Sequence, residues 1–116
     1  MKTAELTVGE QPSEKGTIIA VVGELDLTTV TRLRDVLLAH ANKPDGDRVI
    51  VDLADVEFID SAGLALLVEA RKRLAADSRT LYLVIRQGKQ PERVLRLVRF
   101  DTIMKLVYNL DDIPAS

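Results

Sequence analysis

The sequence predicts an α/β domain whose sheet is mixed but mainly parallel, with four to five strands packed by about four helices. Three nearly continuous apolar runs, at residues 17–22, 48–53 and 80–85, are rich in Val, Ile and Leu, as in strands covered on both faces. Segments with helical spacing follow each run, and this alternation favours βαβ crossovers between parallel strands. A chain of 116 residues with no linker or internal repeat fits one domain over residues 1–116.

The first half of the chain contains two of these runs and one predicted helix. Residues 4–8 alternate loosely and indicate a short edge strand, and residues 9–16 indicate a turn. After the run at residues 17–22, apolar side chains recur at helical spacing from Val30 to Ala41. Asp26 or Thr28 is expected to cap that helix, and residues 43–47 form a loop before the next strand.

The second half predicts a long helix over residues 61–76, which begins at Asp60-Ser61-Ala62-Gly63. The third apolar run follows it. Pro91 suits the first turn of another helix. Residues 103–108 indicate a last strand, and residues 109–112 indicate a terminal helical turn before Pro114.

Composition and charge exclude several function classes. With a net charge of −2, two Tyr, two Phe and no Trp, the chain has neither a basic field nor stacking aromatics for nucleic acid. The absence of cysteine excludes disulfides, thiolate catalysis and zinc–cysteine sites. There is no signal-peptide pattern and no apolar run long enough to span a bilayer, so we expect a cytoplasmic protein without membrane association. No cofactor is expected.

Acidic side chains follow two of the predicted strands. Glu24 and Asp26 come after the strand at residues 17–22, and Asp60 precedes the long helix. Functional groups in open α/β sheets collect at the carboxyl ends of the strands. If the two strands are parallel, both loops lie at the same edge of the sheet, beside Ser61.

A helical wheel gives the long helix two apolar sides. The side expected to face the sheet carries Gly63, Leu66, Leu67, Ala70 and Leu74. The opposite side carries Ser61, Leu64, Ala65, Val68 and Lys72. A helix side that met only water would be polar, so Leu64 and Val68 beside the serine indicate a surface for a partner. The alternative is that a neighbouring loop covers them.

The serine at the start of this helix has two interpretations. Asp60 or Ser61 can accept hydrogen bonds from the first free backbone N–H groups as an N-cap. Alternatively, Ser61 is a phosphorylation site, because unpaired N–H groups and the helix dipole can accommodate a phosphate. Its charge of about −1.5 to −2, near Asp60 and Asp26, would then disturb a docked partner and leave the fold intact.

These motifs resemble the STAS domain of bacterial anti-sigma factor antagonists. The resemblance rests on Gly23-Glu24-Leu25-Asp26, on Val51-Asp52-Leu53 followed by residues 58–64, and on the strand that begins at Leu81. It covers essentially the whole chain. Ala62 stands where many members have a second hydroxyl residue, so that position offers no other phosphate acceptor.

The resemblance implies a partner-switching mechanism. The unphosphorylated antagonist binds an anti-sigma factor that is also a serine kinase with a histidine-kinase-like ATPase fold, and this releases the sigma factor. Phosphorylation of the serine that matches Ser61 switches binding off, and a metal-dependent serine phosphatase restores it. The partner surface expected here consists of Glu24, Asp26, Asp60, Gly63, Leu64 and Val68.

Two other function classes compete with this interpretation. An enzyme is disfavoured, since the sole histidine, His40, falls in the first predicted helix, and no Gly-x-Ser-x-Gly turn, phosphate-binding loop or metal-ligand cluster is present. We therefore expect no catalytic residues. The alternative binding function is a STAS accessory subunit of another assembly, such as a lipid-transport ABC system or a stressosome-like scaffold.

Overall fold

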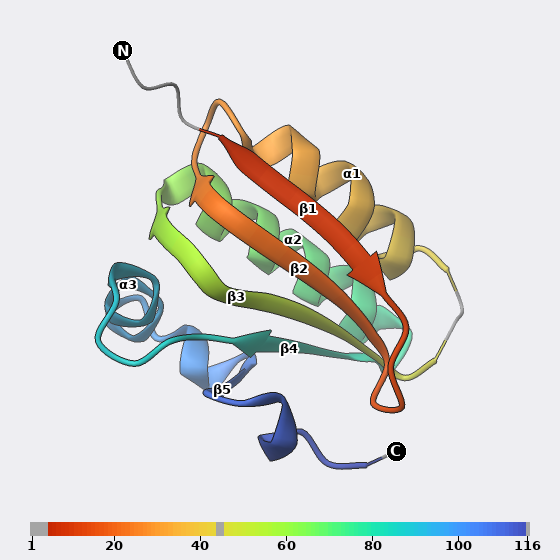
Figure 1. The fold of residues 1–116 in the computed structure, drawn as a ribbon. Helices are drawn as coiled ribbons and strands as arrows, with labels where there is room; N and C mark the ends of the chain where they lie inside the picture. Colours follow the sequence, from red (N-terminus) through yellow and green to blue (C-terminus); the bar gives the residue numbers. More distant parts are fainter. Residues whose placement is uncertain (1–4, 44–45, 116) are drawn as a thin grey trace.

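A five-stranded sheet in the order β1-β2-β3-β4-β5 forms the centre of the molecule (Figure 1). The computed structural model describes residues 5–43 and 46–115. The strands are β1 (Leu6–Gln11), β2 (Thr17–Leu25), β3 (Arg48–Ile59), β4 (Thr80–Val84) and β5 (Lys105–Val107). All neighbouring strands pair in parallel except β1, which runs antiparallel to β2 at one edge. The predicted mixed, mainly parallel sheet is confirmed.

Two helices, α1 (Val30–Ala41) and α2 (Ser61–Ala76), lie side by side against one face of the sheet (Figure 1). A third, α3 (Gln90–Leu97), contacts β3. Short 3-10 turns, η1 (Phe100–Thr102) and η2 (Leu110–Asp112), flank β5. The described part of the chain thus has three α-helices where about four helices were predicted, because the expected terminal turn is only a 3-10 turn. None of these helices is long and apolar enough to cross a membrane.

Strand pairing changes several predicted boundaries. β1 continues to Gln11, where a turn was predicted from residue 9, because residues 9–11 pair with residues 18–20 of β2. β3 continues to Ile59 instead of ending near Leu53, because Phe58 and Ile59 pair with Glu24 and Leu25. β5 is only three residues long, because of the predicted residues 103–108 only residues 105–107 pair with β4. Cross-strand hydrogen bonds outweigh local propensity in these places.

Apolar side chains lie on both faces of the sheet. The main core lies between the sheet and helices α1 and α2, and it includes Leu37, Val51 and Leu67. On the opposite face a smaller cluster of Ile18, Ile50, Val84 and Ile113 is completed by the C-terminal segment. The central strands are therefore covered on both faces, which explains their nearly continuous apolar sequences.

Gln90 takes the place of a missing strand neighbour at the end of β3. β4 pairs with β3 only as far as Asp52, so the backbone of Ile59 has no strand on that side. The Ile59 amide donates to Oε1 of Gln90 at 2.9 Å, and Nε2 of Gln90 donates to the Ile59 carbonyl at 3.0 Å. These two bonds fix the first turn of α3 to the strand that leads into α2.

Replacing Gln90 with Ala should lower the free energy of unfolding by about 1–3 kcal/mol, because both polar groups of the Ile59 backbone lose their partner beside a buried side chain. Urea unfolding of the full chain measures this loss. Gln87→Ala provides the matched control, since Gln87 is exposed in the preceding loop. Equal stabilities of the two variants would contradict the role given to Gln90.

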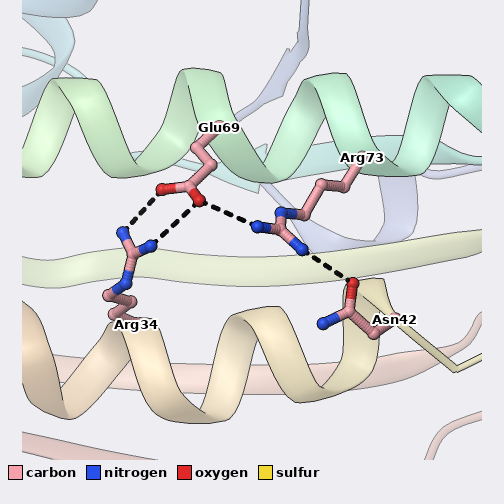
Figure 2. Close-up of polar contacts among 4 residues, drawn as sticks. All are labelled: Arg34, Asn42, Glu69 and Arg73. Atoms are coloured by element: carbon pink, nitrogen blue, oxygen red, sulfur yellow. Dashed lines mark hydrogen bonds and ion pairs between the residues drawn. The ribbon is translucent and has the colours of Figure 1, made fainter.

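A surface network joins α1 to α2 (Figure 2). Arg34 donates two hydrogen bonds to the carboxylate of Glu69, at 2.5 and 3.0 Å, and Arg73 donates to Glu69 at 3.2 Å and to Asn42 at 3.1 Å. The hydrogen bond from Arg34, followed by its charge and that of Arg73, lowers the pKa of Glu69 below its ordinary value of 4.5. Glu69 is therefore ionised in the folded protein at pH values where it begins to protonate in the unfolded chain.

This lowered pKa predicts a loss of stability in acid. The stabilisation from Glu69 is fully present above its unfolded pKa, near 4.5, and is lost as the pH falls through the lower pKa of the folded state. Glu69→Gln should therefore make the free energy of unfolding less dependent on pH below that value, as measured by urea unfolding across a pH series. Glu5→Gln controls for the loss of one exposed carboxylate. An unchanged slope in Glu69→Gln would contradict this account.

Candidate functional site

The carboxyl ends of β2 and β3 meet, as the sequence predicts for parallel strands. The Asp60 amide donates to the Leu25 carbonyl at 3.1 Å. The Leu27 amide donates to Oδ2 of Asp60, also at 3.1 Å. The loop between β2 and α1 therefore lies directly beside the first turn of α2.

Asp60 is the N-cap of α2. Its Oδ1 accepts hydrogen bonds from the amides of Ala62 at 2.9 Å and Gly63 at 3.1 Å. A carboxylate in this position also interacts favourably with the helix dipole. Of the two predicted caps the structure selects Asp60, and the two N–H groups expected to be free for a phosphate are already paired with this carboxylate.

Ser61 is the first residue of α2 and is exposed. Its hydroxyl makes no hydrogen bond with any described residue, since the cap is provided by its neighbour. Ser61 is therefore exposed at the start of the helix, and its hydroxyl takes no part in the cap.

Asp26 organises the loop and does not cap α1. Its Oδ1 accepts from the Thr28 amide at 2.9 Å, the Thr28 hydroxyl at 2.7 Å and the Thr29 amide at 3.1 Å. The hydrogen bond from the Thr28 hydroxyl is the main cause that lowers the pKa of Asp26 below its ordinary value, and the two amides add to it. Thr29 occupies the N-cap position of α1, which corrects the expected cap at Asp26 or Thr28.

The sheet-facing side of α2 is confirmed, because its five predicted residues are all buried. On the opposite side Ser61 and Ala65 are exposed, whereas Leu64 and Val68 are half-buried and pack against the main core. Arg71, further along the same side, donates to the Ile103 carbonyl at 3.1 Å. Leu64 and Val68 are thus less exposed than the wheel indicates, because both pack against the main core.

The other two residues of the predicted partner surface, Glu24 and Gly63, differ in how far they are buried. Glu24 is half-buried in an irregular part of the β2–β3 pairing, opposite Phe58. Gly63 is buried, at the point where α2 approaches Ile59 and Leu25 closely.

Sequence reasoning missed the most exposed apolar side chain at this site, Leu27, which is 76% exposed. Phe58, at the end of β3, is 42% exposed. Leu27 stands between Asp26 and Thr28 in a polar loop, and an apolar residue in that position was the available signal. Its exposure could not be inferred without the hydrogen bonds that set the loop.

The described residues contain no group of three or more His, Asp or Glu side chains arranged to hold a metal ion. His40 lies in the last turn of α1, where its ring contacts Glu10 of β1.

The sequence is similar to a known family of domains and to known proteins. A sequence model described as "Mlab, STAS domain" matches residues 8–108. The anti-sigma-B factor antagonist of Staphylococcus epidermidis is 39% identical over 66 residues, which cover 57% of this chain and 60% of that protein. The chain thus matches less than two thirds of that relative's length.

Solved structures share the fold over nearly the full length. An anti-sigma factor antagonist from Mycobacterium paratuberculosis superposes with a TM-score of 0.84 at 25% identity and covers 94% of this chain and 91% of its own. The Bacillus cell fate determinant SpoIIAA, in its phosphorylated form, gives a TM-score of 0.67 at 17% identity, with 92% and 96% covered. The second likeness concerns the fold alone.

Gly63→Ala should destabilise the protein by about 1–3 kcal/mol, because an added methyl group overpacks this junction. A Cβ at Gly63 would lie 2.9 Å from side-chain carbons of both Ile59 and Leu25. Thermal unfolding measures the effect. Gly9→Ala is the control, since a Cβ there meets nothing within 4 Å. Unchanged stability in Gly63→Ala would show that α2 can move away from the sheet without cost.

Proposed function

The chain belongs to the STAS domain family, and on this basis we propose that it is an anti-sigma factor antagonist, a binding protein and not an enzyme. Its partner is a serine-kinase anti-sigma factor with a histidine-kinase-like ATPase fold. The unphosphorylated chain binds this kinase and releases the sigma factor. Phosphorylation of Ser61 switches binding off, and a metal-dependent serine phosphatase reverses it.

One observation carries this proposal: Ser61 is exposed and its hydroxyl makes no hydrogen bond within the described structure, because the neighbouring Asp60 carboxylate caps the helix. An N-cap serine would use its hydroxyl to hold the helix, and phosphorylation would then break the cap. Here Asp60 holds the helix, so Ser61 is available for phosphorylation without loss of structure. The names of the relatives support the same function.

Charge is the means by which phosphorylation ends binding. The amides of Ala62 and Gly63 already pair with Asp60, so they do not neutralise a new phosphate. Its charge of about −1.5 to −2 would add to those of Asp60 and Asp26 on the surface. A phosphate beside these carboxylates in an interface opposes docking through their mutual repulsion and the cost of removing its water. The complex would therefore separate while α2 stays folded.

The exposure of each residue decides its place in the proposed partner surface. Glu24, Asp26 and Asp60 provide its charge, and half-buried Leu64 and Val68 form its apolar edge along α2. Gly63 lies beneath it. We propose no cofactor and no contact with nucleic acid or membrane, in keeping with the net charge of −2.

The test is phosphorylation and binding with the purified serine-kinase anti-sigma factor. We expect one phosphate, at Ser61, by mass spectrometry. Ser61→Asp should weaken binding of the kinase by about tenfold or more, as like-charge contacts predict, with unchanged thermal unfolding. Ser61→Ala should bind and accept no phosphate. Ser78→Asp places the same charge beyond the other end of α2 and is expected to bind normally.

Phosphate on another residue, or a complex unaffected by Ser61→Asp, would contradict this function. Capture of an ABC ATPase in place of a kinase would support the alternative of an accessory subunit.

A further inference from the structure

A groove lies between the second half of α2 and the segment that leads from η1 into β5. Its volume is about 240 Å³, and its walls are Arg71 and Ala75 of α2, residues 79–81 around the start of β4, and residues 101–105. We propose that this groove, called the α2–η1 groove below, binds a small organic anion through a carboxylate or phosphate group. The site is separate from the surface around Ser61 and goes beyond the proposed function.

The α2–η1 groove lies at the opposite edge of the sheet from Ser61. β3, β4 and β5 are parallel, so the starts of β4 and β5 share one edge, and the end of β3, which Ser61 follows, lies at the other. Along α2, Arg71 stands ten residues after Ser61, which is about 15 Å at a rise of about 1.5 Å per residue. A small ligand held in the groove therefore contacts neither Ser61 nor the carboxylates beside it.

The chain concentrates its positive charge in the region that forms this groove. Ten of the 16 Lys and Arg residues lie between Arg71 and Lys105, together with only three of the 18 Asp and Glu residues. The groove is lined by three cationic side chains, those of Arg71, Arg79 and Lys105, and by one carboxylate, that of Asp101. This local excess of positive charge attracts anions, although the whole chain has a net charge of −2.

Arg71 and Lys105 keep their charge for a ligand. None of the ion pairs among the described residues includes either side chain, and none includes Asp101. Nε of Arg71 donates to the Ile103 carbonyl at 3.1 Å, a bond that positions the guanidinium without neutralising it. The two Nη groups of Arg71 make no hydrogen bond with a described residue. They can therefore donate to two oxygens of one carboxylate or phosphate.

Arg79 holds one wall of the groove rigid. Its side chain is buried, and Nη1 donates to three backbone carbonyls at the end of α1 and just after it, those of His40 at 3.2 Å, Ala41 at 3.2 Å and Lys43 at 2.6 Å. Thr80, half-buried in the same wall, adds a hydroxyl that can donate to an anion. Side chains fixed before a ligand arrives reduce the entropy lost on binding.

The size and the apolar part of the groove limit the ligand. Ligand pockets commonly measure about 300–1,000 Å³, so a groove of 240 Å³ admits only a small molecule. Ala75 and Ile103, which is 40% exposed, place apolar surface beside the cations. A short carbon chain that ends in a carboxylate or a phosphate fits this combination. Glutarate and inorganic phosphate are therefore suitable probes of the two anionic groups.

The test is a titration of the full-length, isotope-labelled chain with glutarate, and separately with inorganic phosphate, followed by amide NMR signals. Sodium chloride keeps the ionic strength constant. With at least one probe we expect saturable shifts confined to signals of Arg71, residues 79–81 and residues 101–105. Shifts spread over the whole surface, or none that saturate with either probe, would overturn the proposal.

Two variants in the groove should change the affinity in opposite directions. Lys105→Gln should weaken binding of the probe about two- to fivefold, because it removes one exposed cation and breaks no hydrogen bond of the described structure. Asp101→Asn should strengthen binding by a similar factor, because it removes the one carboxylate of the lining. Lys72→Gln is the matched control, since Lys72 is exposed on α2 but does not line the groove. Equal affinities in all three variants would contradict the site.

Ser61→Asp distinguishes this proposal from the proposed function. It should bind the probe as the wild-type chain does, because the groove lies at the other edge of the sheet. Loss of probe binding in Ser61→Asp would overturn a separate site. A kinase complex unaffected by Ser61→Asp would overturn the proposed function, and saturable shifts at the groove would still support the anion site.

Discussion

The parallel pairing of β2 with β3 is the constraint on which the rest of the structure depends. It continues from Thr17 and Val49 to Leu25 and Ile59, well past the point where β4 ends. Because the two strands are parallel, both end at the same edge of the sheet, and a turn follows each of them. One turn carries Asp26 and Leu27, and the other carries Asp60 and Ser61. Two segments more than thirty residues apart along the chain thereby form one surface.

Close packing beneath that surface makes the junction rigid. The first turn of α2 approaches Leu25 and Ile59 so closely that a side chain at position 63 would force its neighbours to shift. Above it, the Asp60 carboxylate joins the helix start to the neighbouring loop. At the end of β3, Gln90 satisfies the free backbone edge and brings α3 to the same region. Three residues thus act at the end of β3. Gly63 allows the close approach of α2, Asp60 caps that helix, and Gln90 bonds to the unpaired backbone.

A division of labour between adjacent residues follows from this arrangement. In a simpler helix start the serine would be the cap, and its hydroxyl would be committed to structure. Assigning the cap to Asp60 leaves Ser61 exposed with its hydroxyl outside the cap. Under the proposed function, a phosphate on Ser61 would add its charge beside the Asp60 carboxylate at the surface and not within the core.

The sequence by itself determined the elements that depend on periodicity. The apolar runs predicted the three central strands, and the spacing of residues 61–76 predicted α2 with its buried side, because burial on a sheet imposes a regular pattern on the chain. The bounds of the edge strands β1 and β5 and the 3-10 turns were predicted less well. Pairing with the adjacent strand, and not the local pattern, decides where each edge strand begins and ends.

The surroundings of Ser61 show what only the tertiary structure decided. The sequence indicated a helix start with acids nearby, but it left open which residue caps the helix. It also overstated the exposure of Leu64 and Val68 and did not indicate that Leu27 stands exposed. The cap is set by local bonds from Ala62 and Gly63 to Asp60, whereas the depth of the other side chains depends on packing within the tertiary structure. Contacts between distant segments, such as the bond from the Leu27 amide to Asp60, arrange these surroundings. Local patterns cannot encode such contacts, because they arise only when the parallel strands bring the two loops together.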